Sequence, residues 1–448
     1  MKLSLKFFIP IVFFSYFFQV SAQTGFHFVN SDQKKQKVNF QLINNLIVIP
    51  VEVNGNILSF ILDTGVNKTI LFDLTKNDSL SLQNTTNIKL KGLGEGKGVG
   101  AILSKRNTLS IKNIKSYDET IYLILKDYFD LSSRMGITIH GIIGYNLLKD
   151  LIVNINYNSK KITFYNPKIF RYKKCKKCQT IPFKFYRKKP YINAKLSLDT
   201  INNTFTNVKL LVDSGGSDAI WLFENSKEEI KTPKRFFYDI LGEGLNGTIY
   251  GNRSRIPKFK LGQFEIDNPT VSFLDTTATH SARIFRDRNG SIGGNILKRF
   301  KIWIDYPNKK FTLKKTSSFK NGFHYNMSGL DVIYHGKQLV KQEDKKKFNG
   351  FYSNTETEGT DTFSFVTTYS FVFKPSFKVK SVTKNSPAYI AGVLKDDIIL
   401  EINGTPTHEL TINDIIYKFR EKPGKKIKIK VDRNGEKIDF KFRLERKI

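Results

Sequence analysis

Two short stretches of the chain each place an aspartate in a tight turn after an apolar segment. The two turns are Asp63-Thr64-Gly65 and Asp213-Ser214-Gly215. Two carboxylates a few ångström apart cannot both ionise readily, so they share one proton and one pKa rises. Such a pair can accept a proton from a water molecule and donate one to a neighbouring oxygen, which is the chemistry of metal-free hydrolysis.

Several short sequence segments that follow the first aspartate recur after the second, at a nearly constant offset of about 150 residues. Three pairs of segments carry the repeat: 93–96 and 241–244, 141–149 and 290–298, and 155–163 and 304–312. A long repeat at constant offset indicates a duplicated unit, and two copies are too few for a solenoid. The sequence therefore predicts two similar lobes that contribute one aspartate each to a common site.

Most segments around these motifs have the pattern of strands. Residues 45–62 are predicted to form a hairpin that turns at Asn54-Gly55. Short helices are predicted at 146–151 and 295–300, directly after conspicuous glycines. Both lobes are therefore expected to be rich in β-structure.

These elements resemble the aspartic proteases of the pepsin-like and retropepsin-like clan, over both lobes. The resemblance rests on the Asp-Thr/Ser-Gly turn, a later glycine-rich hairpin and an apolar-apolar-glycine loop in each lobe. The two loops are 142–144 and 291–293, where Ser291 departs from the apolar preference. The resemblance implies that Asp63 and Asp213 act together on a peptide bond, with no cofactor and no metal.

The same resemblance assigns supporting roles to the residues of the two turns. They are Thr64, Gly65, Ser214 and Gly215. The glycines allow a sharp turn that brings amide N–H groups towards the carboxylates. The hydroxyls are implied to bond to the backbone of the opposite lobe.

The family's flap corresponds to a glycine-rich hairpin in each lobe. The flap candidates are Gly94, Glu95, Gly96, Gly242, Glu243 and Gly244. Residues 92–98 contain no tyrosine, which fits a retropepsin-like flap better than a pepsin-like one. Two interpretations of the glutamates stay open, a preference for basic or polar substrates and simple exposure to solvent.

The region from residue 377 to 446 resembles a PDZ domain, because short strands and helices follow in that family's order. A PDZ domain binds a peptide as an added edge strand and holds its terminal carboxylate in backbone amides. The peptide-binding candidates are Ser328, Gly329 and Leu330, and residues 338–370 are predicted to be an insertion. A tethering domain for substrate or partner C-termini and a purely structural domain packed on the lobes both remain open.

Composition limits the other function classes. The chain has 73 Lys+Arg against 40 Asp+Glu, a formal net charge of +33. The basic residues are scattered over strand-like segments without a helical or zinc-finger signature, which argues against nucleic acid as a partner. Two interpretations of the charge stay open, a coding bias towards lysine on solvated faces and a long-range attraction to an anionic envelope surface or acidic substrate.

The first 22 residues have the pattern of an export signal. Lys2 and Lys6 precede a largely apolar stretch that ends in the small-residue triplet Val20-Ser21-Ala22. The sequence therefore predicts a periplasmic or extracellular protein that is soluble after signal cleavage. In such a compartment Cys175 and Cys178 are expected to form a disulfide, since no second Cys or His pair completes a zinc site.

The predicted fold is mainly β, a bilobal pair of aspartic-protease β-barrels from internal duplication followed by a small α+β PDZ domain. The expected order is a signal peptide (1–22), a first lobe (23–168), a linker with Cys-x-x-Cys (169–179), a second lobe (180–316) and the PDZ domain (320–448). The expected function is an exported aspartic endopeptidase acting on protein or peptide substrates. The alternative is a catalytically silent, peptide-binding envelope scaffold.

Overall fold

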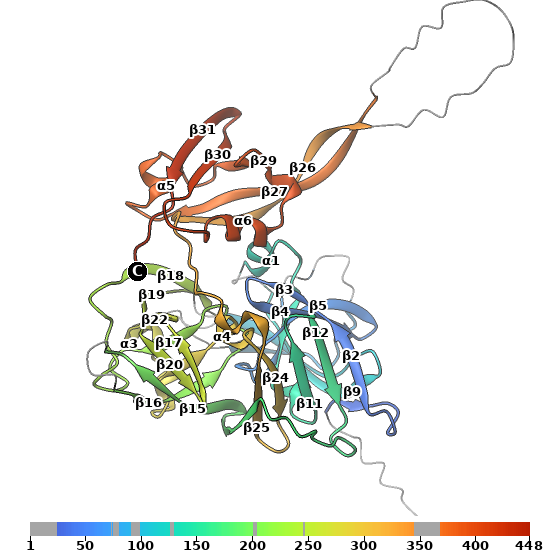
Figure 1. Cartoon of the computed structure of the whole chain (residues 1–448). Coiled ribbons are helices and arrows are strands. Elements are labelled where there is room, and N and C mark those ends of the chain that lie inside the picture. Colours follow the sequence, from blue (N-terminus) through green and yellow to red (C-terminus); the bar gives the residue numbers. More distant parts are fainter. Residues whose placement is uncertain are drawn as a thin grey trace, which may run out of the picture.

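The computed structural model describes residues 25–72, 74, 80–90, 99–125, 130–199, 204–244, 247–344 and 368–448. Two β-rich lobes lie side by side, and a smaller C-terminal domain lies over them (Figure 1). The predicted signal peptide and the flap candidates Gly94, Glu95 and Gly96 lie outside the described residues. Within the described ranges, no helix is both long enough and apolar enough to cross a membrane.

The first lobe is built on a nine-stranded sheet. Its strands are β1 (His27–Phe28), β3 (Gln41–Ile43), β4 (Leu46–Val53), β5 (Asn56–Leu62), β6 (Thr69–Leu71), β7 (Thr86–Leu90), β8 (Val99–Ile111), β9 (Ile114–Leu123) and β10 (Gly141–Ile143). The hairpin predicted over residues 45–62 is present, because β4 and β5 pair antiparallel around Asn54 and Gly55. Two short helices, α1 (Leu131–Met135) and α2 (Tyr145–Leu148), flank β10.

The second lobe repeats this plan in a ten-stranded sheet. Its strands are β14 (Lys184–Tyr186), β15 (Lys189–Ser197), β16 (Thr206–Val212), β17 (Ile220–Phe223), β18 (Phe237–Gly244), β19 (Gly247–Arg255), β20 (Lys258–Leu261), β21 (Phe264–Asp267), β22 (Thr270–Leu274) and β23 (Gly290–Ile292). Its short helices are α3 (Thr276–Thr279), η1 (Ala282–Ile284) and α4 (Gly294–Leu297). The parallel pair β16–β23 matches β5–β10, and the antiparallel pair β17–β23 matches β6–β10, so both repeats use one ladder.

A six-stranded sheet joins the two lobes. Its order is β13 (Cys178–Pro182), β25 (Lys310–Lys315), β24 (Phe300–Asp305), β11 (Ile152–Asn156), β12 (Lys161–Tyr165) and β2 (Lys35–Asn39). At its centre, β11 and β24 come from equivalent positions of the two repeats and pair antiparallel. The end of the predicted linker belongs to this sheet, because β13 begins at Cys178, which forms a disulfide with Cys175.

The C-terminal domain contains the remaining sheet and the capped helices that the sequence indicates. Its elements are β26 (Leu330–Asp344), β27 (Thr368–Val382), α5 (Pro387–Ile390), β28 (Ile398–Ile402), β29 (Thr405–Pro406), η3 (Thr407–Glu409), α6 (Ile412–Lys418), β30 (Lys426–Arg433) and β31 (Glu436–Arg443). In its described part, the predicted insertion at 338–370 forms the extended arms of the β26–β27 hairpin, which project away from the body (Figure 1).

The C-terminal domain is fixed to both lobes by polar contacts. Arg235 of the second lobe donates to the carbonyl of Lys447 in the C-terminal domain at 2.8 Å. The buried guanidinium of Arg299 donates to carbonyls of the connecting segment around η2 (Ser317–Lys320), those of Phe319, Asn321 and Gly322. On the other side, the Asn413 side chain accepts from the backbone N–H of Asn44 at 2.9 Å. The domain is therefore held to the lobes by more than its linker.

Candidate active site

The two aspartates occupy equivalent positions at the ends of β5 and β16. The backbone N–H of Asp63 donates to the carbonyl of Ile143, and that of Asp213 donates to the carbonyl of Ile292, both at 2.9 Å. The parallel neighbour strands β10 and β23 therefore hold the two turns in the same way. The turns meet where the lobes meet.

The hydroxyls next to the aspartates interlock the lobes. Thr64 Oγ1 donates to the carbonyl of Val212 at 2.6 Å and accepts from the backbone N–H of Ser214 at 3.0 Å. Ser214 Oγ donates to the carbonyl of Leu62 at 2.7 Å and accepts from the backbone N–H of Thr64 at 3.0 Å. Both side chains are buried, so neither has water as an alternative partner. These cross-lobe bonds have the arrangement that the resemblance implies.

Replacing Thr64 with valine should destabilise the protein by about 2–4 kcal/mol, because it leaves a buried N–H and a buried carbonyl without partners. Thr64→Ser keeps the hydroxyl and should cost about 1 kcal/mol or less. Denaturant unfolding of the two variants measures the difference. Equal stability of the valine and serine variants would show that these hydrogen bonds do not hold the lobes together.

The carboxyl groups of Asp63 and Asp213 lie close together, beside the glycines of both turns. Asp63 Oδ1 accepts from the Gly65 N–H at 2.6 Å, and Asp213 Oδ1 accepts from the Gly215 N–H at 3.2 Å. A Cβ on Gly65 would lie 2.9 Å from Asp213 Oδ1 and 3.1 Å from Asp63 Oδ1, and one on Gly215 would lie 2.3 Å from Asp63 Cγ. The two carboxyl groups, one from each lobe, thus face each other across these glycines. The glycines are therefore required so that the carboxylates can approach each other.

Burial is the main reason that Asp63 prefers its neutral form, and the adjacent charge of Asp213 adds to it. Together they raise the pKa of Asp63 to about 8, against the opposing effects of the Gly65 N–H and of Lys189. Asp63 therefore holds a proton at neutral pH. A protonated carboxyl beside a second carboxylate is the arrangement that acid–base hydrolysis needs.

Lys189 is a site residue that the motif analysis did not identify. It is the first residue of β15, and burial lowers its pKa, helped by Arg288 and opposed by Asp63 and Asp213. In the repeat it occupies the place of the apolar Leu46, the first residue of β4. A lysine that replaces an apolar residue in one copy of a duplicated unit is the sequence signal that could have indicated it.

Tyr306 is a second residue near the pair that the sequence did not single out. Its ring is buried beside Tyr145 and Phe185, and its hydroxyl has no hydrogen-bond partner among the described residues. Burial raises its pKa, and the charge of Asp63 adds to the effect. The phenol is therefore held neutral near Asp63.

The second glycine-rich hairpin is formed by β18 and β19, with Glu243 opposite Thr248 and Gly244 opposite Gly247. Gly242 lines a cavity next to the aspartate turns. In the first lobe, β7 and β8 pair antiparallel as far as Leu90 and Val99, directly before and after residues 91–98. The structure therefore places a hairpin in each lobe, and describes the flanks of the first one.

The PDZ peptide-binding candidates lie directly before and at the start of β26. The Leu330 N–H donates to Ser328 Oγ at 3.0 Å, so this amide already has a partner. Gly329 has φ +83°, and a Cβ there would lie 2.1 Å from the side chain of Ser386. The loop therefore requires glycine at position 329, and the Ser328 hydroxyl already occupies the Leu330 N–H that a peptide carboxylate would otherwise bind.

Helix α1 of the first lobe packs where a PDZ ligand would add to the sheet. Arg134 in α1 forms an ion pair with Asp331 in β26 at 3.3 Å, and a Cβ on Gly136 would lie 3.3 Å from Ile412 of α6. Met135 belongs to the same apolar core as Leu330. Figure 1 shows α1 directly below α6. A peptide that paired with this edge of β26 would therefore have to displace α1.

The described residues contain no group of three or more His, Cys, Asp or Glu side chains placed to hold a metal ion.

Residues 200–296 match the family model described as aspartyl protease, and residues 378–433 match that of the PDZ domain. An aspartyl-protease-like region is therefore followed by a PDZ domain. A solved aspartic proteinase from Irpex lacteus is similar at 14% identity and a TM-score of 0.43, over 64% of this chain and 99% of that one. No curated protein matches the chain.

Proposed function

We propose that the chain is an exported aspartic endopeptidase that hydrolyses protein or peptide substrates. One observation carries the proposal: the carboxyl groups of Asp63 and Asp213 lie next to each other, across Gly65 and Gly215, at the junction of two interlocked lobes. The backbone N–H groups of Gly65 and Gly215 donate to the two carboxyl groups, and Lys189 lies near enough to interact with both.

The reaction follows from the protonation of the pair. The carboxylate of the pair that carries no proton accepts one from a water molecule, whose oxygen attacks the carbonyl carbon of the peptide bond. The protonated carboxyl group of the pair donates its proton to the carbonyl oxygen, which gives a tetrahedral diol. The C–N bond then breaks as the nitrogen receives a proton from the pair, so that one carboxyl group and one amine form for each water consumed.

The proposed location is the periplasm or the extracellular space. It rests on the charged, apolar and small-residue order of the first 22 residues and on a disulfide between Cys175 and Cys178. The net charge of +33 supports a weak attraction to anionic envelope surfaces. Mass spectrometry of the secreted protein would test the predicted export and signal cleavage, with Gln23 as the expected first residue.

Digestion of a peptide library by the mature protein, from about pH 4 to pH 8, tests the proposed hydrolysis. We expect internal cleavage that a hydroxyl-bearing mimic of the tetrahedral diol inhibits. The matched control is Asp213→Asn, purified in the same way, which should leave the library intact. Equal cleavage by both proteins would indicate a contaminating protease, and no cleavage by the wild type would favour a silent scaffold.

Removing the charge of Lys189 should move the pH dependence of hydrolysis upward. A cation near the pair favours the ionised carboxyls, so Lys189→Met should raise the pKa of Asp63 further. We expect the alkaline decline of kcat/KM to shift by about half a pH unit or more, whereas Lys189→Arg should resemble the wild type. An unchanged profile in Lys189→Met would exclude Lys189 from the electrostatics of the site.

A further inference from the structure

A cavity of about 310 Å³ lies between the PDZ domain and both lobes. It begins at Gly215 and Gly216, directly after Asp213, and a Cβ on Gly216 would lie 3.6 Å from the Asp213 carboxyl group. Its opposite wall includes Met327 and Arg420 of the PDZ domain. The volume is at the lower end of the range for small-ligand pockets. A peptide bound at the aspartate pair would therefore have space for a side chain here.

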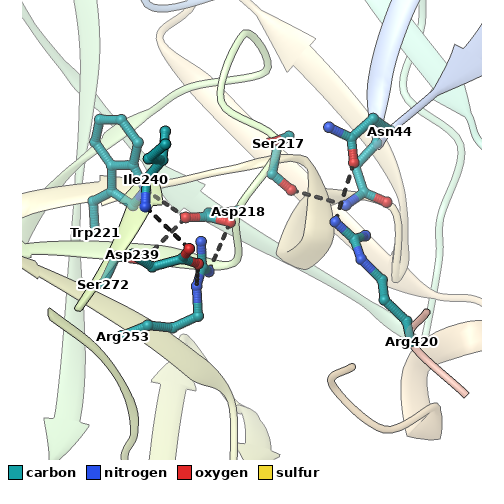
Figure 2. Close-up of polar contacts among 10 residues, drawn as sticks. Asn44, Ser217, Asp218, Trp221, Asp239, Ile240, Arg253, Ser272 and Arg420 are labelled. Atoms are coloured by element: carbon teal, nitrogen blue, oxygen red, sulfur yellow. Dashed lines mark hydrogen bonds and ion pairs between the residues drawn. The ribbon is translucent and has the colours of Figure 1, made fainter. Parts of the chain in front are cut away.

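The acidic groups on the lobe side of this cavity are already paired. Arg253 donates to Asp218 at 3.0 Å and to Asp239 at 2.8 Å (Figure 2). Trp221 and Ser272 also donate to Asp218, at 2.9 and 3.0 Å. Burial alone would raise the pKa of Asp218, but Arg253 and these donors lower it below its ordinary value. The carboxylates of Asp218 and Asp239 therefore already have partners within the second lobe.

Arg420 also lines the cavity and, unlike Arg134 and Arg253, forms no ion pair with a carboxylate among the described residues. Its Nη2 donates one long hydrogen bond, 3.5 Å, to Asn44 Oδ1 (Figure 2). Its Nε is buried and has no acceptor among the described residues, and no carboxylate in those residues forms an ion pair with it. Burial lowers its pKa, as does Arg253, while Asp218 and Asp239 offset part of this. A guanidinium with free donors in a cavity fits a carboxylate, which it can bind with two parallel hydrogen bonds.

We propose that this cavity binds an acidic side chain of the substrate, with Arg420 as the specificity-determining residue supplied by the PDZ domain. The inference rests on the proposed peptidase function and names its substrate class. The cavity connects the backbone beside Asp213 to the PDZ domain, so the acidic residue lies close to the scissile bond. The PDZ domain then acts as a wall of the substrate site.

Two synthetic peptide libraries, identical except that glutamine replaces glutamate, test the proposal. For the wild type, kcat/KM should be about tenfold higher for peptides with glutamate than for peptides with glutamine at one position near the cleaved bond. Arg420→Gln should reduce this ratio to about two or less, and Arg420→Lys should retain part of it. The control is Arg443→Gln, an exposed arginine of the same domain that is absent from the cavity wall, which should leave ratio and total cleavage unchanged.

Binding measurements separate this inference from the proposed hydrolysis. Calorimetry of the glutamate and glutamine libraries with Asp213→Asn should show about tenfold tighter binding of glutamate peptides, lost when Arg420→Gln is added. The proposal would be overturned if proteins that retain Arg420 bound and cleaved the two libraries equally, or if Arg420→Gln kept the same preference for glutamate. A preference that disappears when the peptide C-terminus is amidated would assign the carboxylate to a chain end and also overturn it. Tight glutamate binding without any wild-type cleavage would support this site while contradicting the peptidase function.

Discussion

Replacing Asp63 or Asp213 with asparagine should reduce kcat/KM for any cleaved peptide by at least about 10³-fold. An amide can neither accept the proton of water nor deliver one to the carbonyl oxygen, and acid–base catalysis typically contributes 10²–10⁴-fold at each such group. Both variants should remain folded, because the amide keeps the size of the side chain and can still accept from Gly65 or Gly215. Initial rates with one fluorogenic peptide, compared at equal protein concentration, measure the loss.

Asp63→Asn should also change how the free energy of unfolding of the protein depends on pH. The pKa of Asp63 is raised from 3.8 to about 8 in the folded protein, so the folded state binds more protons than the unfolded state between these values. Stability from this group is present at low pH and is lost as pH rises through about 8. Asp63→Asn removes this dependence, so its stability relative to wild type should increase by at least about 1 kcal/mol between pH 5 and pH 9. A parallel pH dependence in both proteins would mean that Asp63 is not buried beside a second charge.

Gly144→Ala should be strongly destabilising. A Cβ there would lie 2.0 Å from the carbonyl oxygen of Asp63 and 2.7 Å from that of Val66, both backbone atoms that cannot rotate away. The turn must shift or the lobe must open, and we expect a loss of about 3 kcal/mol or more together with loss of hydrolysis. Urea unfolding and cleavage rates provide the two readouts.

Gly100→Ala is the matched control, because nothing lies within 4 Å of a Cβ at that position of β8. Its stability should stay within about 0.5 kcal/mol of wild type. If Gly144→Ala were as stable and as active as Gly100→Ala, the close packing of the loop 142–144 under the Asp63 turn would be refuted.

The sequence was sufficient to predict the duplicated β architecture. Each copy carries its own turn, loop and strand pattern, so local motifs indicate the repeat without any long-range information. In the structure, the equivalent segments of the two halves form equivalent parallel strand pairs, β5–β10 and β16–β23. The pairing of β11 with β24 across the lobes was not predicted, because strand periodicity does not specify a partner strand.

The environment of the pair was harder to predict than the pair itself. Lys189 and Tyr306 approach Asp63 only because the lobes fold against each other. Arg420 reaches the cavity from more than 200 residues away in the sequence, as part of a domain whose docking no motif describes. Contacts of this kind depend on tertiary packing, which carries no local periodic signal.

The position of α1 also changes the interpretation of the PDZ domain. The sequence left a tethering role and a structural role open. With Arg134 paired to Asp331 and α1 packed on β26, the domain is packed against the first lobe in this arrangement. Binding of a C-terminal peptide stays a prediction, with displacement of α1 as its structural requirement.

The pH dependence of kcat/KM for one cleaved peptide, measured from about pH 4 to pH 10 in wild type and Asp63→Asn, tests most directly whether two carboxylates share a proton to activate water. We predict a decline in the wild type above about pH 8, where Asp63 loses its proton, and no measurable cleavage by the variant at any pH. A wild-type rate that stays constant to pH 10, or a variant that cleaves as fast as the wild type, would contradict the shared-proton site.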